Sequence, residues 1–211
     1  MIEESEFFSA KTLLEIQMYI KRIRETIKGN IEEIKKMRLK TGLYKKYREE
    51  LIPLLEYGIL EYGLECKYLF QLIKGNQSYD AVVLKDGAVI EIIEITNPQN
   101  GEKNFIDAKE LNDNGITEIK VFGSESQNEI SSIIVNTALK KAKKNYKDKT
   151  LVIFIDEAFE FDLSDEDDCY VLDDLSNYLR SIKYSAAKVV FLIMHQNWDK
   201  AKYDSKIYSI K

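Results

Sequence analysis

Apolar residues recur at helical spacing in the first quarter of the chain. The spacing over residues 13–27 is close to 3.6, which predicts a helix that begins after an N-cap at Ser9 and ends at Gly29. Residues 31–40 are expected to form a second helix, which is basic toward its C-terminal end. These patterns predict an N-terminal helical segment over residues 1–52.

The pattern changes to two-residue alternation at about residue 67. Three strands are expected, over residues 67–73, 79–85 and 88–96. Asp86 and Gly87, between the last two strands, are a strong signal for a tight hairpin turn. We therefore predict a three-stranded antiparallel meander, preceded by a helix that has Pro53 in its first turn.

The remaining residues alternate helices with apolar runs. Helices are expected near residues 105–111, from about residue 124 to the lysines at 140–144, and within residues 165–183. A short strand is expected at 118–122, and buried strands at 150–155 and 188–194. This order predicts an α/β (α+β) fold, a mixed sheet flanked by helices, in a domain that spans residues 53–211.

Composition excludes several classes of protein. The 211 residues are 45% hydrophobic and 32% charged, which is typical of a globular chain. Apolar runs stay well short of the roughly 20 residues that cross a bilayer, and the N-terminus is acidic, so we expect a soluble, cytoplasmic, bacterial-style protein without a membrane partner. Cys66 and Cys169, with the single His195, are a poor zinc ligand set, and both cysteines are expected to be buried.

Charge is distributed unevenly, although the net charge is only −5. Residues Lys21–Arg48 hold 11 basic and 3 acidic residues, whereas Asp156–Asp174 holds 10 acidic residues and no basic one. Each stretch is interpreted either as an ordinary solvated helical surface or as a surface that attracts a partner of opposite charge. For the basic stretch, that partner would be nucleic acid.

The strongest candidate for chemistry is a pair of carboxylates in the predicted meander. Asp80 opens its second strand, and Glu94 lies near the end of the third, on the same face as Thr96 and opposite to Glu91. Two carboxylates in an otherwise apolar strand pair suit Mg²⁺ or Mn²⁺. The alternative is that Asp80 caps a hairpin and that the glutamates are ordinary exposed positions.

The order of helix, three-strand meander, helix and strand resembles the PD-(D/E)xK restriction-endonuclease-like superfamily over about residues 53–122. The resemblance implies that Asp80 matches the family's Asp, and that Glu94-Ile95-Thr96 matches its Glu-x-Lys, with threonine in place of lysine. It also implies a further metal ligand from the preceding helix, for which Glu56 and Glu61 are candidates.

The threonine leaves two interpretations open. Lys103 or Lys109 moves into the site and orients the attacking water, or the core is a catalytically silent scaffold. In the first case the resemblance implies a Mg²⁺- or Mn²⁺-dependent nuclease that acts on DNA or RNA. The rival hypothesis is a non-enzymatic immunity- or antitoxin-type protein, whose acidic Asp156–Asp174 surface would bind a basic toxin.

Overall fold

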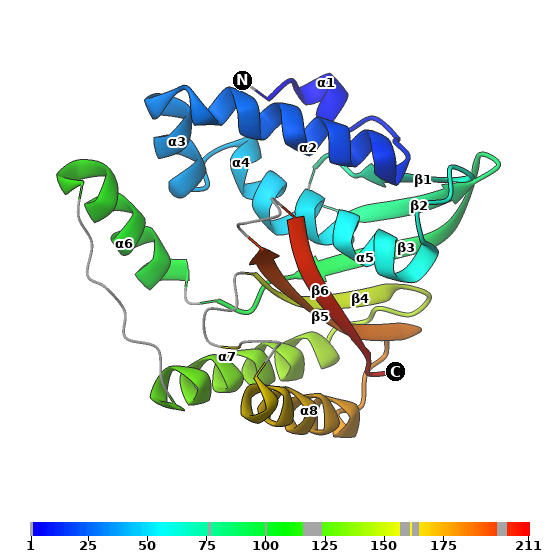
Figure 1. Cartoon of the computed structure of the whole chain (residues 1–211). Coiled ribbons are helices and arrows are strands. Elements are labelled where there is room, and N and C mark those ends of the chain that lie inside the picture. The colour runs from blue at the N-terminus through cyan, green and yellow to red at the C-terminus, as the bar shows by residue number, and fades with distance from the viewer. Residues whose placement is uncertain are drawn as a thin grey trace. The chain divides into compact units, whose positions relative to one another are not determined.

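The chain folds into a six-stranded mixed sheet with helices around it (Figure 1). The computed structural model describes residues 2–75, 77–99, 101–115, 124–156, 161, 165–197 and 202–211. The strands are ordered β1-β2-β3-β4-β5-β6, which confirms the predicted fold class. Residue contacts divide the chain into a first unit, Met1–Glu91 with Asn100–Lys120, and a second unit, Ile92–Gln99 with Val121–Lys211. The boundary expected after residue 52 stays a prediction.

Helices occupy the N-terminal part of the first unit. They are α1 (Glu4–Phe7), α2 (Leu13–Lys28), α3 (Ile31–Arg38) and α4 (Leu43–Lys46). The prediction of Ser9 as the N-cap of α2 is wrong, because Thr12 forms a capping box with Glu15. The Ser9 hydroxyl instead donates to the Glu6 carbonyl at the end of α1. Gly29 ends the helix as predicted.

A distorted turn leads into the most buried helix of the first unit. The π-helical turn η1 (Tyr47–Leu51) runs directly into α5 (Ile52–Tyr62), which has Pro53 in its first turn as predicted. Gly58 of α5 lies close to Leu13 of α2 and Phe70 of the sheet, which leaves little space for a side chain. The three elements therefore share one closely packed contact.

The predicted meander is present. Strand β1 (Tyr68–Leu72) pairs antiparallel with β2 (Ala81–Lys85), and a two-residue turn connects β2 to β3 (Ala88–Thr96). Both turn residues, Asp86 and Gly87, have positive φ angles, of 52° and 78°, as a type I′ hairpin requires. Lys11 exchanges two backbone hydrogen bonds with Phe70, so part of the outer edge of β1 is paired.

Helix α6 (Gly101–Asn114) completes the first unit and is longer than the predicted 105–111. It has no fully buried side chain, and it is joined to α3 by two hydrogen bonds. The Arg38 guanidinium donates to the Asn112 side-chain oxygen at 3.3 Å. The Asn112 side-chain nitrogen in turn donates to the Lys35 carbonyl at 3.2 Å. Polar contacts hold this helix on α3.

The second unit contains α7 (Ser124–Ala142), β4 (Thr150–Asp156), α8 (Glu166–Ser181), β5 (Lys188–Asn197) and β6 (Lys202–Ser209). Strand β4 is parallel to both β3 and β5, and β6 is antiparallel to β5. Helices α7 and α8 lie side by side (Figure 1). Their apolar residues form one core with alternate residues of the strands, among them Ile134, Ala138, Leu172, Leu179, Leu151, Ile153, Val189 and Phe191.

The strand predicted at 118–122 lies outside the described residues, and β6 was not predicted. Cys66 is exposed, so the expectation that both cysteines are buried is wrong for it. In the described part of the chain, helices are too short or too polar to cross a membrane.

The contact at Gly58 gives a first prediction. A Cβ at this position would lie 2.6 Å from Leu13 Cδ2 and 3.0 Å from Phe70 Cε1, and both side chains are buried. Gly58→Ala should therefore lower the free energy of unfolding by about 1–3 kcal/mol, although alanine normally favours a helix by ~1 kcal/mol. Urea denaturation measures the change.

Gly29→Ala is the matched control. Gly29 has an ordinary φ of −97°, and no described atom lies within 4 Å of a Cβ built there. This variant should be neutral or slightly stabilising, and an equal loss in both variants would contradict the packing argument.

Candidate functional site

Glu94 lies on β3 in the second unit, and its carboxylate is paired with a lysine and accepts a hydrogen bond from a tyrosine. The Lys141 ammonium of α7 contacts Oε1 at 2.7 Å, and the Tyr146 hydroxyl donates to the same oxygen at 3.1 Å. The ion pair is largely shielded, because the Glu94 and Lys141 side chains are 13% and 16% exposed. The sequence analysis did not identify Lys141, which is 47 residues away from Glu94.

Glu91, on the opposite face of β3, accepts hydrogen bonds from two tyrosines of α5. The Tyr57 hydroxyl donates at 2.8 Å and the Tyr62 hydroxyl at 2.6 Å. Burial first, and then the Glu91 carboxylate, raise the pKa of both tyrosines well above the usual value. Both hydroxyls therefore remain protonated donors, and Glu91 belongs to a structural network rather than to an open surface.

Asp80 lies in the first unit immediately before β2, which begins at Ala81 rather than at the predicted residue 79. Its carbonyl accepts a hydrogen bond from the Ile73 backbone N–H at 2.8 Å, which fixes the backbone where β1 and β2 meet. Its carboxylate is close enough to Glu50 to raise the pKa of that residue. This electrostatic interaction connects Asp80 to Glu50, which lies in the turn η1.

Glu50, in the turn η1, has a strongly raised pKa. Its side chain is 16% exposed, and the Lys46 ammonium contacts both carboxylate oxygens, at 2.8 and 2.7 Å. Burial raises the pKa of Glu50 to about 7; Lys46 opposes the rise, and Asp80 adds to it. The cluster of Lys46, Glu50 and Asp80 thus combines one cation with two neighbouring acids, next to a π-helical turn of the kind often found at functional sites.

The other predicted metal ligands have different surroundings. Glu56 is buried on α5, and Glu61 is exposed near the two tyrosines that bind Glu91. Asp80 belongs to the first unit and Glu94 to the second, so the prediction that they share a cation stays a prediction. Among the described residues, no group of three or more His, Cys, Asp or Glu side chains is arranged to hold a metal ion.

The structure also describes the position that aligns with the family's lysine and the two lysines that were predicted to replace it. Thr96 ends β3 and lies opposite Ile153 of β4. Lys103 and Lys109 are exposed on α6 in the first unit. Their proposed approach to Glu94 stays a prediction, and Lys141 and Lys46 are the lysines that contact Glu94 and Glu50.

The basic stretch Lys21–Arg48 contains many internal ion pairs. Five of its eleven basic residues contact a carboxylate of the first unit, namely Arg22 with Glu6, Lys35 with Glu32, Lys36 with Glu33, Lys40 with Glu49 and Lys46 with Glu50. Lys21, Lys28 and Lys45 have exposed side chains. Only part of the basic excess is therefore available for phosphate contacts.

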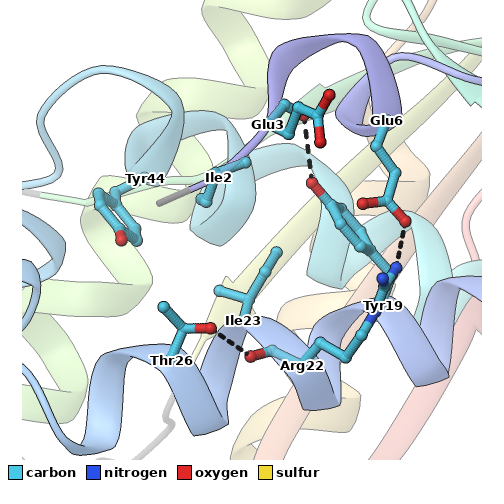
Figure 2. Close-up of a pocket in the computed structure, with 8 residues that line it drawn as sticks. All are labelled: Ile2, Glu3, Glu6, Tyr19, Arg22, Ile23, Thr26 and Tyr44. Atoms are coloured by element: carbon cyan, nitrogen blue, oxygen red, sulfur yellow. Dashed lines mark hydrogen bonds and ion pairs between the residues drawn. The ribbon is translucent and has the colours of Figure 1, made fainter.

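A small cavity lies among α1, α2 and α4 in the first unit (Figure 2). It encloses about 190 Å³, and Tyr19, Arg22 and Tyr44 are among its lining residues. Arg22 is ion-paired with Glu6, and burial raises the pKa of Tyr19 to about 12. The cavity is smaller than typical ligand pockets, which have volumes of about 300–1,000 Å³, so the Glu50 cluster is the stronger candidate.

Comparison of the chain with protein-family models, with curated proteins and with solved structures gave no match. The geometry of the described residues therefore carries the functional argument.

The Glu94–Lys141 pair gives a second prediction. Lys141→Ala should lower the free energy of unfolding by about 1–3 kcal/mol, because it leaves a shielded carboxylate without its cation. Lys140→Ala is the matched control, since Lys140 is exposed on the same helix. Urea denaturation should show a change within about 0.5 kcal/mol for the control. Equal changes in the two variants would show that the pair contributes nothing measurable.

Glu50 gives a third prediction, which concerns pH. Its folded-state pKa of about 7 lies above the unfolded value of ~4.3, so between these pH values the folded state keeps a proton that the unfolded state has released. The free energy of unfolding should fall as pH rises through this window at about 1.36 kcal/mol per pH unit, which amounts to roughly 3 kcal/mol between pH 5 and pH 8. Denaturation at pH 5 and pH 8 measures this.

Glu50→Gln should remove this part of the pH dependence, because glutamine has the same shape and does not titrate. Glu32→Gln is the control, since Glu32 lies in an exposed pair with Lys35. An unchanged slope in Glu50→Gln would contradict the raised pKa.

Proposed function

We propose that this protein is a metal-dependent, nuclease-like protein that acts on phosphodiesters of DNA or RNA, and that the cluster of Lys46, Glu50 and Asp80 binds its divalent cation. One arrangement carries the proposal: Lys46 contacts both carboxylate oxygens of the largely buried Glu50, and the charge of Asp80 acts on the same carboxyl group. A divalent cation at this position would bind to both acidic side chains.

The donor set fits Mg²⁺ or Mn²⁺. Both ions prefer carboxylate oxygens, and Mg²⁺ is usually held by one or two carboxylates while water and phosphate oxygens fill its other positions. Glu50 and Asp80 supply two carboxylates in this cluster. In this proposal Glu50 takes the place that the resemblance gave to Glu56 or Glu61.

Each side chain of the cluster has a role that its chemistry supports. A bound cation would lower the pKa of a water ligand and stabilise negative charge on the phosphate. Glu50 must release its proton before it can act as a ligand, so cation binding is coupled to pH. Lys46 supplies a positive charge that Thr96 cannot, and it would contact the phosphate once Glu50 turns to the cation.

The basic stretch supports nucleic acid as the substrate. Lys21, Lys28 and Lys45 expose ammonium groups on the first unit, which also holds the Glu50 cluster. Phosphate contacts by such residues give affinity that does not depend on base sequence. The cytoplasm stays the predicted location.

A fourth prediction tests this proposal directly. Mn²⁺ should raise the thermal midpoint of the purified protein more at pH 8 than at pH 6, because protonated Glu50 competes with the ion. Mn²⁺ should also support cleavage of DNA or RNA oligonucleotides. Asp80→Asn and Glu50→Gln should each abolish the Mn²⁺-dependent shift, and should reduce cleavage by about 100-fold or more.

Glu61→Gln is the matched control, since it removes an exposed carboxylate of the adjacent helix. This variant should leave the Mn²⁺-dependent rise in thermal midpoint and the rate of cleavage unchanged. A Mn²⁺-dependent shift without cleavage would indicate a metal-binding scaffold rather than an enzyme. Absence of any shift at pH 8 in the wild-type protein would refute the cation site.

A further inference from the structure

The outer face of α8 carries exposed tyrosines between carboxylates. Leu172, Leu175 and Leu179 form the inner face and belong to the core of the second unit. A second face, roughly 120° around the helix axis from the first, exposes a set of residues at helical spacing: Asp167, Tyr170, Val171, Asp174 and Tyr178. Tyr170 is 69% exposed and Tyr178 is 50% exposed, so their rings contribute little to the core.

Helix stability accounts for the acids of the first turn of α8, Asp167 among them, but not for Asp174. Asp165 caps the helix by accepting from the Asp168 N–H, and acids of the first turn are favoured by the helix dipole. Asp173 lies 3.8 Å from Lys206 of β6. Asp174 gains neither advantage, because it is exposed beyond the first turn, and aspartate is a weak helix former.

Charge determines which partner this face fits. Residues 165–179 include no lysine or arginine, so the carboxylates on the outer face meet no basic side chain from their own helix segment. Carboxylates pair with Lys and Arg, and tyrosine rings accept both the cation and the apolar stem of these side chains. A nucleic-acid backbone would be repelled by the same carboxylates.

We propose that the outer face of α8, the stripe from Asp167 to Tyr178, is a docking surface for a basic segment of a protein partner. Carboxylates and aromatic rings alternate along the stripe, so a Lys- or Arg-bearing segment finds both ion-pair and cation–π contacts. This inference does not depend on the proposed cation site, because its residues lie in the second unit and Glu50 lies in the first.

The test uses a fluorescent, Lys- and Arg-rich synthetic peptide of about 15 residues as the probe, with the full chain titrated at low and high salt. Binding should be detectable at low salt and should weaken as salt screens the charges. Asp167→Asn with Asp174→Asn should lower the affinity by about 10-fold, and Tyr170→Ala with Tyr178→Ala by roughly 5-fold. Circular dichroism and thermal midpoints verify that each variant is folded.

Glu25→Gln with Glu32→Gln is the matched control, because it removes the same charge from exposed positions of α2 and α3. The control should bind the peptide within about twofold of wild type. If the control and the aspartate variant lose the same amount of affinity for the peptide, the binding depends only on net charge, and the inference is overturned. Wild-type affinity in the tyrosine variant, or no binding at low salt, would also overturn it.

Sedimentation of the protein alone provides the last comparison. A monomer at low salt supports a separate protein partner. Self-association that the aspartate variant abolishes would identify a second copy of this chain as the occupant, and would overturn the proposal of a different partner.

Discussion

A carboxylate that is removed from water must gain a cation or hydrogen-bond donors, and three glutamates of this protein meet that requirement differently. Glu91 gains two tyrosine hydroxyls, and Glu94 gains a lysine and a tyrosine hydroxyl. Glu50 gains only part of the required compensation, because Asp80 opposes the effect of Lys46 and burial dominates both. The two glutamates of β3 are therefore integrated into their units, whereas burial keeps the pKa of Glu50 near 7.

Local signals in the sequence predicted most of the fold. The Asp86-Gly87 turn, the alternation of β3 and the apolar runs of β4 and β5 depend on neighbouring residues, so they could be read directly. The N-cap of α2 is Thr12, three residues after the predicted Ser9, because only Thr12 has a glutamate, Glu15, at the spacing that a capping box requires. Strand β6 was missed because its sequence, KYDSKIYS, has charged residues on an edge strand, and its pairing depends on β5.

The candidate site was less predictable, because its contacts are long-range. The position of Asp80 near the start of a strand makes it recognisable in the sequence, but nothing near Glu94 in the sequence indicates Lys141, which lies 47 residues away. Lys46 and Glu50 have the four-residue spacing of a helical ion pair, which was available in the sequence. The burial that raises the pKa of Glu50 was not, because it depends on the π-helical turn and on tertiary packing.

The internal ion pairs also change how the charge asymmetry should be interpreted. At least five of the eleven basic residues in the stretch Lys21–Arg48 neutralise carboxylates of their own unit, so at most six are available to displace counterions from nucleic acid. Since each neutralised phosphate contributes about 0.9 to the slope of log affinity against log salt, six contacts would limit that slope to about −5. The carboxylates and tyrosines of α8 attract the opposite charge, so nucleic acid and a basic protein segment would each select a different surface of the chain.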